Sequence, residues 1–139
     1  MKVEKNKALV RRYVDEVQNE HCLEALDTIF SKNFVDHSQI LGSMFQNIDG
    51  LKRGYTDMLA AFPDFHVTIN EQIGEGNKVV THKTITATHA GEFRGIAATH
   101  RQVEFQVIDI FTINDGLISE CWFLFEEYKL MQQIGAIDS

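Results

Sequence analysis

The segment AAFPDFHVTIN (residues 60–70) contains the only proline of the chain and separates two hydrophobic patterns. Before Pro63, apolar residues recur at the spacing of an amphipathic helix, as at Leu51, Tyr55 and Met58. After Pro63, apolar and polar residues alternate, as they do in a strand that buries one face. Because proline moves the preceding residue out of helical geometry, the sequence predicts that a helix ends here and a sheet begins.

The residues before this segment predict two more helices and one short extended piece. The first helix has a single apolar stripe formed by Leu9, Val10, Tyr13, Val14 and Val17. A shorter second helix carries Leu23, Leu26, Ile29 and Phe30. The extended piece is NFVDHS (residues 33–38), and Asp49 is expected to cap the helix that ends at Pro63.

The residues after Pro63 predict four strands in an antiparallel meander. The first begins near Phe65, two more cover residues 78–89 and 102–113, and the last runs from about Leu117 to Glu127. GEGN (residues 74–77) is a predicted turn, and NDG (residues 114–116) is a strong hairpin signal. We therefore expect one α+β domain over residues 1–139, with three N-terminal helices packed on one face of an antiparallel sheet.

The last two predicted strands are apolar at both alternating positions. A sheet with one face in water would alternate more cleanly between apolar and polar residues. The second apolar face therefore predicts contact with another subunit, most simply in a symmetric homodimer.

The composition excludes several classes of function. The chain has 139 residues and a net charge of −7, with 13 basic against 20 acidic residues. This charge disfavours binding to nucleic acids and to anionic membranes. Cys22 and Cys121 do not form a disulfide framework, and no apolar run approaches the ~20 residues of a membrane span. We expect a reduced, cytoplasmic protein.

An ordered set of short motifs extends over most of the chain. The motifs are FVDHS (34–38), AAFPDFHV (60–67), THAGEFRG (88–95), INDGLISECW (113–122) and a Trp-x₃-acid-x₃-Leu-x-Gln-Gln-x-Gly tail (122–135). In this set the sequence resembles the SnoaL-like polyketide cyclases, or ester cyclases, of the ketosteroid-isomerase-like and nuclear-transport-factor-2-like superfamily. The resemblance implies a cone-shaped, curved sheet whose concave face and helices surround a deep apolar pocket, commonly in a dimer or tetramer. It also implies intramolecular aldol closure of a polyketide methyl ester without a metal or an organic cofactor.

The resemblance further implies that residue 126 is the general acid/base. The family has an Asp four residues after the Trp, and this chain has Glu126 four residues after Trp122. Strand alternation predicts that Trp122, Leu124 and Glu126 share the pocket face, although a one-residue bulge would exchange Glu126 with Glu127. A Glu carboxylate lies about 1.5 Å further from the backbone than an Asp carboxylate. A misplacement of ~1 Å can cost ~10²-fold in rate, so either the substrate differs or the chain binds without this chemistry.

Trp122 and three histidines complete the predicted substrate-binding set. His37 matches a family position whose imidazole lines the pocket, with a surface position as the alternative. His82 shares a semi-polar strand face with Val80, Thr84 and Thr86, which suits a cavity or a structural hydrogen bond. His89 is expected at the pocket rim or as a support of its loop. No metal site is expected, because His82 and His89 differ by an odd number of residues and no His-x-His pair exists.

Three functions remain open at this point. The first is a cofactor-free acid/base enzyme that acts on a carbonyl-activated carbon, as a cyclase, an isomerase or a dehydratase. The second is a protein that binds a small apolar or polyketide-like molecule without converting it, since one fold hosts many functions. The third is epoxide hydrolysis by an Asp-Arg-Asp set, for which Arg94, Arg101 and Asp109 are the candidates.

Overall fold

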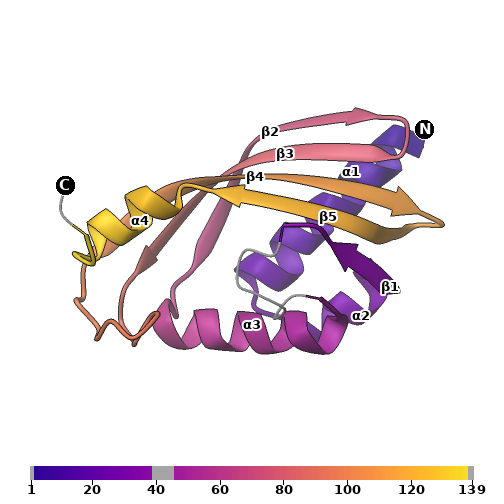
Figure 1. Ribbon diagram of the computed structural model, residues 1–139. Coiled ribbons are helices and arrows are strands. Elements are labelled where there is room, and N and C mark those ends of the chain that lie inside the picture. Colours follow the sequence, from indigo (N-terminus) through magenta and orange to yellow (C-terminus); the bar gives the residue numbers. More distant parts are fainter. Residues whose placement is uncertain (1, 39–45, 138–139) are drawn as a thin grey trace.

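A computed structural model of the chain describes residues 2–38 and 46–137 (Figure 1). Within them, helix α1 (Lys2–Arg12) continues as a π-helical segment (Tyr13–Asn19), and a 3₁₀ turn (Leu23–Ala25) leads into helix α2 (Leu26–Ile29). The remaining elements are β1 (Phe30–Asp36), α3 (Ile48–Ala61), β2 (His66–Glu75), β3 (Lys78–Thr88), β4 (Gln102–Asn114), β5 (Leu117–Phe125) and α4 (Glu127–Gln133). None of the described helices is long and apolar enough to cross a membrane.

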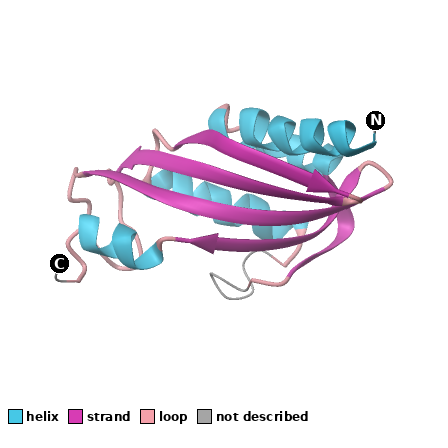
Figure 2. Cartoon of the chain, turned by 90° about the horizontal axis from the view of Figure 1, so that it is seen from above, coloured by secondary structure: helices cyan, strands magenta, loops and turns pink. Residues whose placement is uncertain are grey.

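The strands form one curved sheet in the order β1-β5-β4-β3-β2 (Figures 1 and 2). The four strands β2 to β5 form the predicted antiparallel meander. The predicted extended piece is a fifth strand, β1, which pairs in parallel with β5, so the sheet is mixed. The α+β fold class with helices against one sheet face is confirmed, with one strand and the C-terminal helix α4 added to the prediction.

Helix α3 ends at Ala61, two residues before Pro63, as predicted. The expected N-cap, however, was wrong. Asn47 has an extended backbone, and its side chain accepts a hydrogen bond from Gly50 N at 2.7 Å, which satisfies one free amide of the first turn. Asp49 lies inside the first turn, where a carboxylate still favours the positive end of the helix dipole.

The hairpin between β4 and β5 forms at the predicted turn, where Asp115 and Gly116 have φ of 52° and 76°. The end of β5 differs from the prediction. The strand stops at Phe125 instead of Glu127, and α4 begins at Glu127. The segment EYKLMQQ is composed largely of good helix formers, and this preference ends β5 although its partner β4 extends further, to Gln102.

The hydrophobic core lies between the inner face of the sheet and the N-terminal helices. One cluster joins α1, the π-helical segment, β1 and the ends of β3 to β5, with Tyr13, Phe30 and Phe111 at its centre. The second joins Phe62, Phe65 and the opposite ends of β3 and β4 to α4. The predicted apolar stripe of the first helix is buried in these clusters.

The loop between β3 and β4 is tied to the C-terminal end of α3. The amides of Ala90 and Gly91 both donate to the Ala61 carbonyl, at 2.9 and 3.0 Å. A Cβ atom on Gly91 would lie 2.1 Å from the Ala60 carbonyl oxygen. Only glycine lets the loop approach the helix this closely, and this approach positions the following residues, Phe93 and Arg94.

We predict that Gly91→Ala lowers the free energy of unfolding by about 1–3 kcal/mol, the usual cost of an added group in a close-packed contact. Urea denaturation followed by circular dichroism measures this change. Glu92→Ala, at the exposed neighbouring position, is the matched control and should change stability little. Equal stability of Gly91→Ala and the wild type would show that the loop does not need this contact.

Candidate functional site

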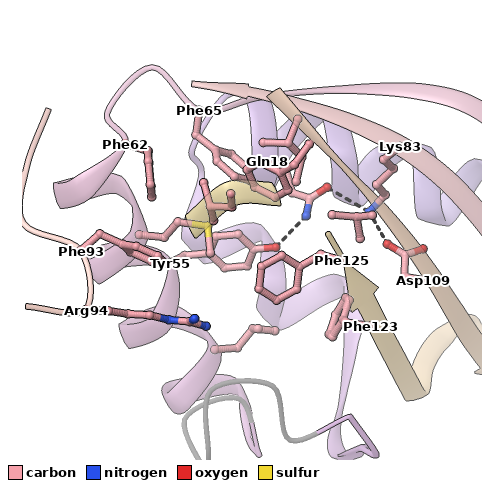
Figure 3. Close-up of a pocket in the computed structure, with 16 residues that line it drawn as sticks. Gln18, Tyr55, Phe62, Phe65, Lys83, Phe93, Arg94, Asp109, Phe123 and Phe125 are labelled. Carbon is pink, nitrogen blue, oxygen red and sulfur yellow. Dashed lines mark hydrogen bonds and ion pairs between the residues drawn. The ribbon is translucent and has the colours of Figure 1, made fainter. Parts of the chain in front are cut away.

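A cavity of about 110 Å³ lies between the inner face of the sheet, α3 and the β3–β4 loop (Figure 3). Its wall is mainly apolar and rich in phenylalanine, because strands β4 and β5, the segment between α3 and β2, and the β3–β4 loop each present phenylalanines to it. These are Phe62, Phe65, Phe93, Phe105, Phe123 and Phe125. Such a cavity suits a small apolar ligand, with a few polar groups to orient it.

A buried ion pair forms the deepest polar part of this cavity. Lys83 Nζ lies 2.5 Å from Asp109 Oδ2, and the two side chains are 1% and 0% exposed. Lys83 and Asp109 stand in neighbouring strands, where Lys83 is opposite Val107 and Asp109 is opposite Thr81. They are therefore diagonal neighbours on the inner face, within reach of a long side chain.

The environment of Asp109 raises its pKa above the ordinary value for an aspartate. Burial raises the pKa of Asp109, because removal from water penalises the carboxylate more than the Lys83 ammonium favours it. Oδ1 of Asp109 has no hydrogen-bond partner of good geometry among the described residues, although the Thr81 hydroxyl, opposite it in β3, lies close enough to lower the pKa of Asp109. A carboxylate with a raised pKa and a free oxygen atom can accept a proton from a molecule in the cavity.

A chain of hydrogen bonds extends from this pair across the cavity wall. Lys83 Nζ donates to Gln18 Oε1 at 3.1 Å, and Gln18 Nε2 donates to the Tyr55 hydroxyl at 2.8 Å. The hydroxyls of Tyr55 and Tyr13 share a short hydrogen bond. Burial raises the pKa of Tyr55 to about 12 and that of Tyr13 well above its ordinary value, so both remain hydroxyl donors.

The mouth of the cavity carries a second basic group, Arg94. Its guanidinium Nη1 lies 3.2 Å from Glu127 Oε1, at the start of α4. Arg94 and Phe93 line the cavity from the β3–β4 loop, and Leu130 lines it from α4. Figure 1 shows the loop and α4 at the same end of the sheet. The two segments therefore meet at the cavity mouth.

The structure places Trp122 and His37 on the other face of the sheet. Asp109 is opposite Phe123 and Val107 is opposite Phe125, so these two phenylalanines follow the inward row of β4. The predicted pocket face, Trp122, Leu124 and Glu126, was therefore wrong for the strand. The His37 ring stacks on Trp122 at 4.5 Å between ring centroids, and His37 Nε2 lies 2.9 Å from Glu120 Oε2.

The other two predicted histidines also lie outside the cavity wall. His82 is on the outer row of β3, where its Nε2 forms a 2.8 Å hydrogen bond with Gln106 Oε1. His89 is fully buried, and its Nδ1 accepts a hydrogen bond from Thr99 N at 3.3 Å, which links the two ends of the loop. This contact agrees with the loop-supporting alternative. The ring of His89 also packs beside Phe62, which lines the cavity, and the pocket-rim role of His89 stays a prediction.

Glu126 lies at the junction of β5 and α4, with a half-exposed side chain. Its Oε1 accepts a hydrogen bond from Gln106 N at 2.9 Å and lies 3.9 Å from Lys129 Nζ. Its neighbours in sequence, Phe125 and Glu127, respectively line the cavity and pair with Arg94. Glu126 does not line the cavity in this arrangement, and its catalytic role stays a prediction.

Gln18, Tyr55 and Lys83 line the cavity but were not predicted from the sequence as site residues. A signal for Lys83 was present, since Lys83 interrupts an inward row that contains Val79, Ile85 and Ala87. The epoxide-hydrolase candidates do not assemble, because Arg101 donates to the Gln133 carbonyl at 3.3 Å and Asp109 pairs with Lys83. Over the described ranges, no cluster of three or more His, Cys, Asp or Glu residues is placed to bind a metal.

Comparisons with known proteins place this geometry in a family. A sequence model of the SnoaL-like polyketide cyclases matches residues 8–134. A search of curated proteins found no match. Among solved structures, TsrD from Streptomyces laurentii is 24% identical, with a TM-score of 0.86 over 96% of this chain and 97% of that one. AclR from Streptomyces galilaeus is also 24% identical, with a TM-score of 0.86 over 99% and 85%.

A third structure is that of a candidate polyketide cyclase from Bacillus cereus. It is 26% identical, with a TM-score of 0.83 over 96% of this chain and 82% of that one. The family match covers nearly the whole chain, including every strand and the residues of the cavity wall. This chain therefore belongs to the SnoaL-like polyketide cyclase family.

Proposed function

We propose that this protein is a cofactor-independent acid/base enzyme that acts on a carbonyl-activated carbon of a small apolar molecule. The observation that carries the proposal is the buried carboxylate of Asp109, which has a raised pKa and an unpartnered oxygen inside an aromatic cavity. Membership of the cyclase family supports the same class of chemistry. Cyclisation, isomerisation and dehydration would all use such a base inside an apolar cavity.

Asp109 is the proposed base. Its carboxylate removes a proton from the carbon next to the substrate carbonyl, and the proton then resides on Asp109 until it is returned or passed on. The adjacent Lys83 ammonium acts against burial and lowers the pKa of Asp109, which favours the ionised form. The aromatic wall excludes water, which strengthens each electrostatic interaction inside the cavity.

Tyr55 is the proposed donor to the enolate oxygen. Its hydroxyl accepts a hydrogen bond from Gln18. When Tyr13 donates to Tyr55 in their shared bond, the Tyr55 proton is free to donate into the cavity. A donor fixed in position before the reaction stabilises developing negative charge without reorganisation.

We predict that Asp109→Asn lowers carbon-acid exchange by at least ~100-fold, the usual contribution of a general base. The assay follows deuterium incorporation from D₂O into apolar ketones and β-keto esters, including 2-indanone, by mass spectrometry. Glu126→Gln is the matched carboxylate variant and tests the base that the family resemblance implies. A large loss in Glu126→Gln with normal exchange in Asp109→Asn would assign the role to Glu126 instead.

Two controls make this result interpretable. Asp109→Asn leaves the Lys83 charge buried without its partner, a change that can cost about 3–5 kcal/mol of stability. The Lys83→Met, Asp109→Asn double variant removes both charges together and replaces the single variant if that one does not fold. If the wild type shows ligand-dependent thermal stabilisation but no exchange above buffer, the non-enzymatic binding alternative is favoured.

The proposed base also predicts the pH dependence of the reaction. Only the ionised form of Asp109 accepts a proton, so exchange falls as the pH drops through its folded-state pKa. Because burial raises the pKa of Asp109, this acidic limb lies above the ordinary Asp value of about 3.9. A pH–rate profile of wild-type exchange measures it. An acidic limb at or below the ordinary value would contradict Asp109 as the base.

We also propose that the protein is a homodimer that pairs through the outer face of its sheet. Ile108 and Leu124 are cross-strand neighbours that are 46% and 72% exposed, and the half-buried pair Ile110 and Trp122 lies beside them. Contiguous exposed apolar side chains of this kind mark contact surfaces. A tetramer would need a further surface.

Leu124→Glu is predicted to convert the dimer to a monomer, because it would bury a charge without a partner at the centre of the contact. Size-exclusion chromatography with light scattering measures the mass. Tyr128→Glu, which introduces the same charge at an exposed aromatic residue of α4, should leave the dimer intact. A monomeric wild type at micromolar concentration would rule out this assembly.

A further inference from the structure

Two of the described residues that line the cavity are cationic, Lys83 and Arg94. Arg94 has no buried counter-charge among the described residues. The other cation, Lys83, is neutralised by Asp109 inside the protein. The Arg94 side chain is 26% exposed, and its partner Glu127 is half-exposed and does not line the cavity. Ion pairs exposed to this extent contribute little to stability, so Glu127 can release Arg94 at low cost.

The backbone fixes Arg94 at the mouth. Phe93 and Ile96 exchange two N–H···O hydrogen bonds of 2.9 Å each, which close a tight two-residue turn. Arg94 and Gly95 occupy this turn with φ of 51° and 80°, as in the hairpin turns in which both central residues have positive φ. Figure 3 shows the guanidinium extending from the loop toward the space below Tyr55. The turn thus directs a planar cationic group into the opening.

The immediate surroundings of the guanidinium are mostly apolar. Its central carbon lies 5.1 Å from the centre of the Phe93 ring, and Nη1 lies 4.0 Å from the Met131 sulfur. Phe125 and Leu130 line the same part of the cavity. A cation flanked by apolar side chains attracts an anion more strongly than it would in bulk water. The planar fork of arginine matches the two oxygens of a carboxylate.

We propose that Arg94 binds the carboxylate of an amphipathic ligand whose apolar body fills the cavity, and that this carboxylate displaces Glu127. The inference shares one premise with the proposed function, which is that the ligand binds in this cavity. It does not require that Asp109 act as a base. It places the ligand carboxylate at the mouth and directs the apolar part of the ligand toward Asp109 and Tyr55. The ligand class is thereby narrowed from apolar molecules to small aromatic or alicyclic carboxylic acids.

Binding of matched acids and esters tests the inference by isothermal titration calorimetry. The probes are benzoate, cinnamate and 2-naphthoate, each beside its methyl ester, which has nearly the same shape without the charge. We expect Arg94→Gln to weaken binding of the best-bound acid by ~10-fold, as for loss of one charge-assisted hydrogen bond, and to change binding of its ester by less than twofold. Arg53→Gln, which removes the same charge from an exposed position outside the cavity wall, should leave both affinities unchanged.

Glu127→Gln provides the opposite test, because it removes the carboxylate that competes with the ligand. We expect this variant to bind the acid two- to fivefold more tightly than the wild type does, with the ester unaffected. Equal losses for acid and ester in Arg94→Gln would mean that Arg94 only shapes the cavity, and would overturn the inference. No change in either affinity, or no binding of any acid by the wild type, would overturn it as well.

These measurements involve no turnover, so they remain valid if the acid/base chemistry fails. Acid-selective binding in a protein without carbon-acid exchange would uphold Arg94 and reject Asp109 as the base. Exchange that depends on Asp109, with no preference between acid and ester at Arg94, would do the reverse.

Discussion

The buried Lys83–Asp109 ion pair is the constraint on which the cavity depends. Two charges that are almost completely removed from water are costly unless they are paired and hydrogen-bonded. Here Lys83 pairs with Asp109 and donates to Gln18, whose amide in turn reaches Tyr55. One network therefore links β3 and β4 to the π-helical segment and to α3. Because each member is held by the next, the polar groups at the base of the cavity keep a single arrangement.

The π-helical segment is part of the same constraint. Tyr13, Val14, Val17 and Gln18 are all buried, a set that spans six residues at the end of the first helix. Wider helical turns of this kind are frequent at functional sites. In this chain the segment presents Gln18 to Lys83 and Tyr55 while Tyr13 remains in the core. The helix supplies both a core stripe and a polar contact to the cavity.

Sequence periodicity predicted the fold well because the chain changes period once, at Pro63. The antiparallel strands and the hairpin at residues 114–116 follow from local patterns that tertiary contacts do not override. The pairing of β1 with β5 could not be predicted in this way, since parallel pairing joins segments far apart in sequence. The inward face of β5 was misassigned for a related reason. Both faces of this strand are apolar, so only its register with Asp109 and Val107 decides which row is inside.

This reversal exchanges the roles that were predicted from the sequence for the two faces of β5. Trp122, His37 and His82 lie on the outer face, beside the apolar pairs that we assign to subunit contact. The inner face holds Asp109 and Tyr55, to which we assign the acid/base chemistry, and the mouth holds Arg94. The cavity is therefore polar at both ends and apolar between them. A molecule that carries one carboxylate and one reactive carbonyl would bind in one orientation, because among the described cavity residues only Arg94 offers its carboxylate a cation that is not neutralised inside the protein. Orientation then follows from electrostatics, and the aromatic wall needs only to match the shape of the ligand.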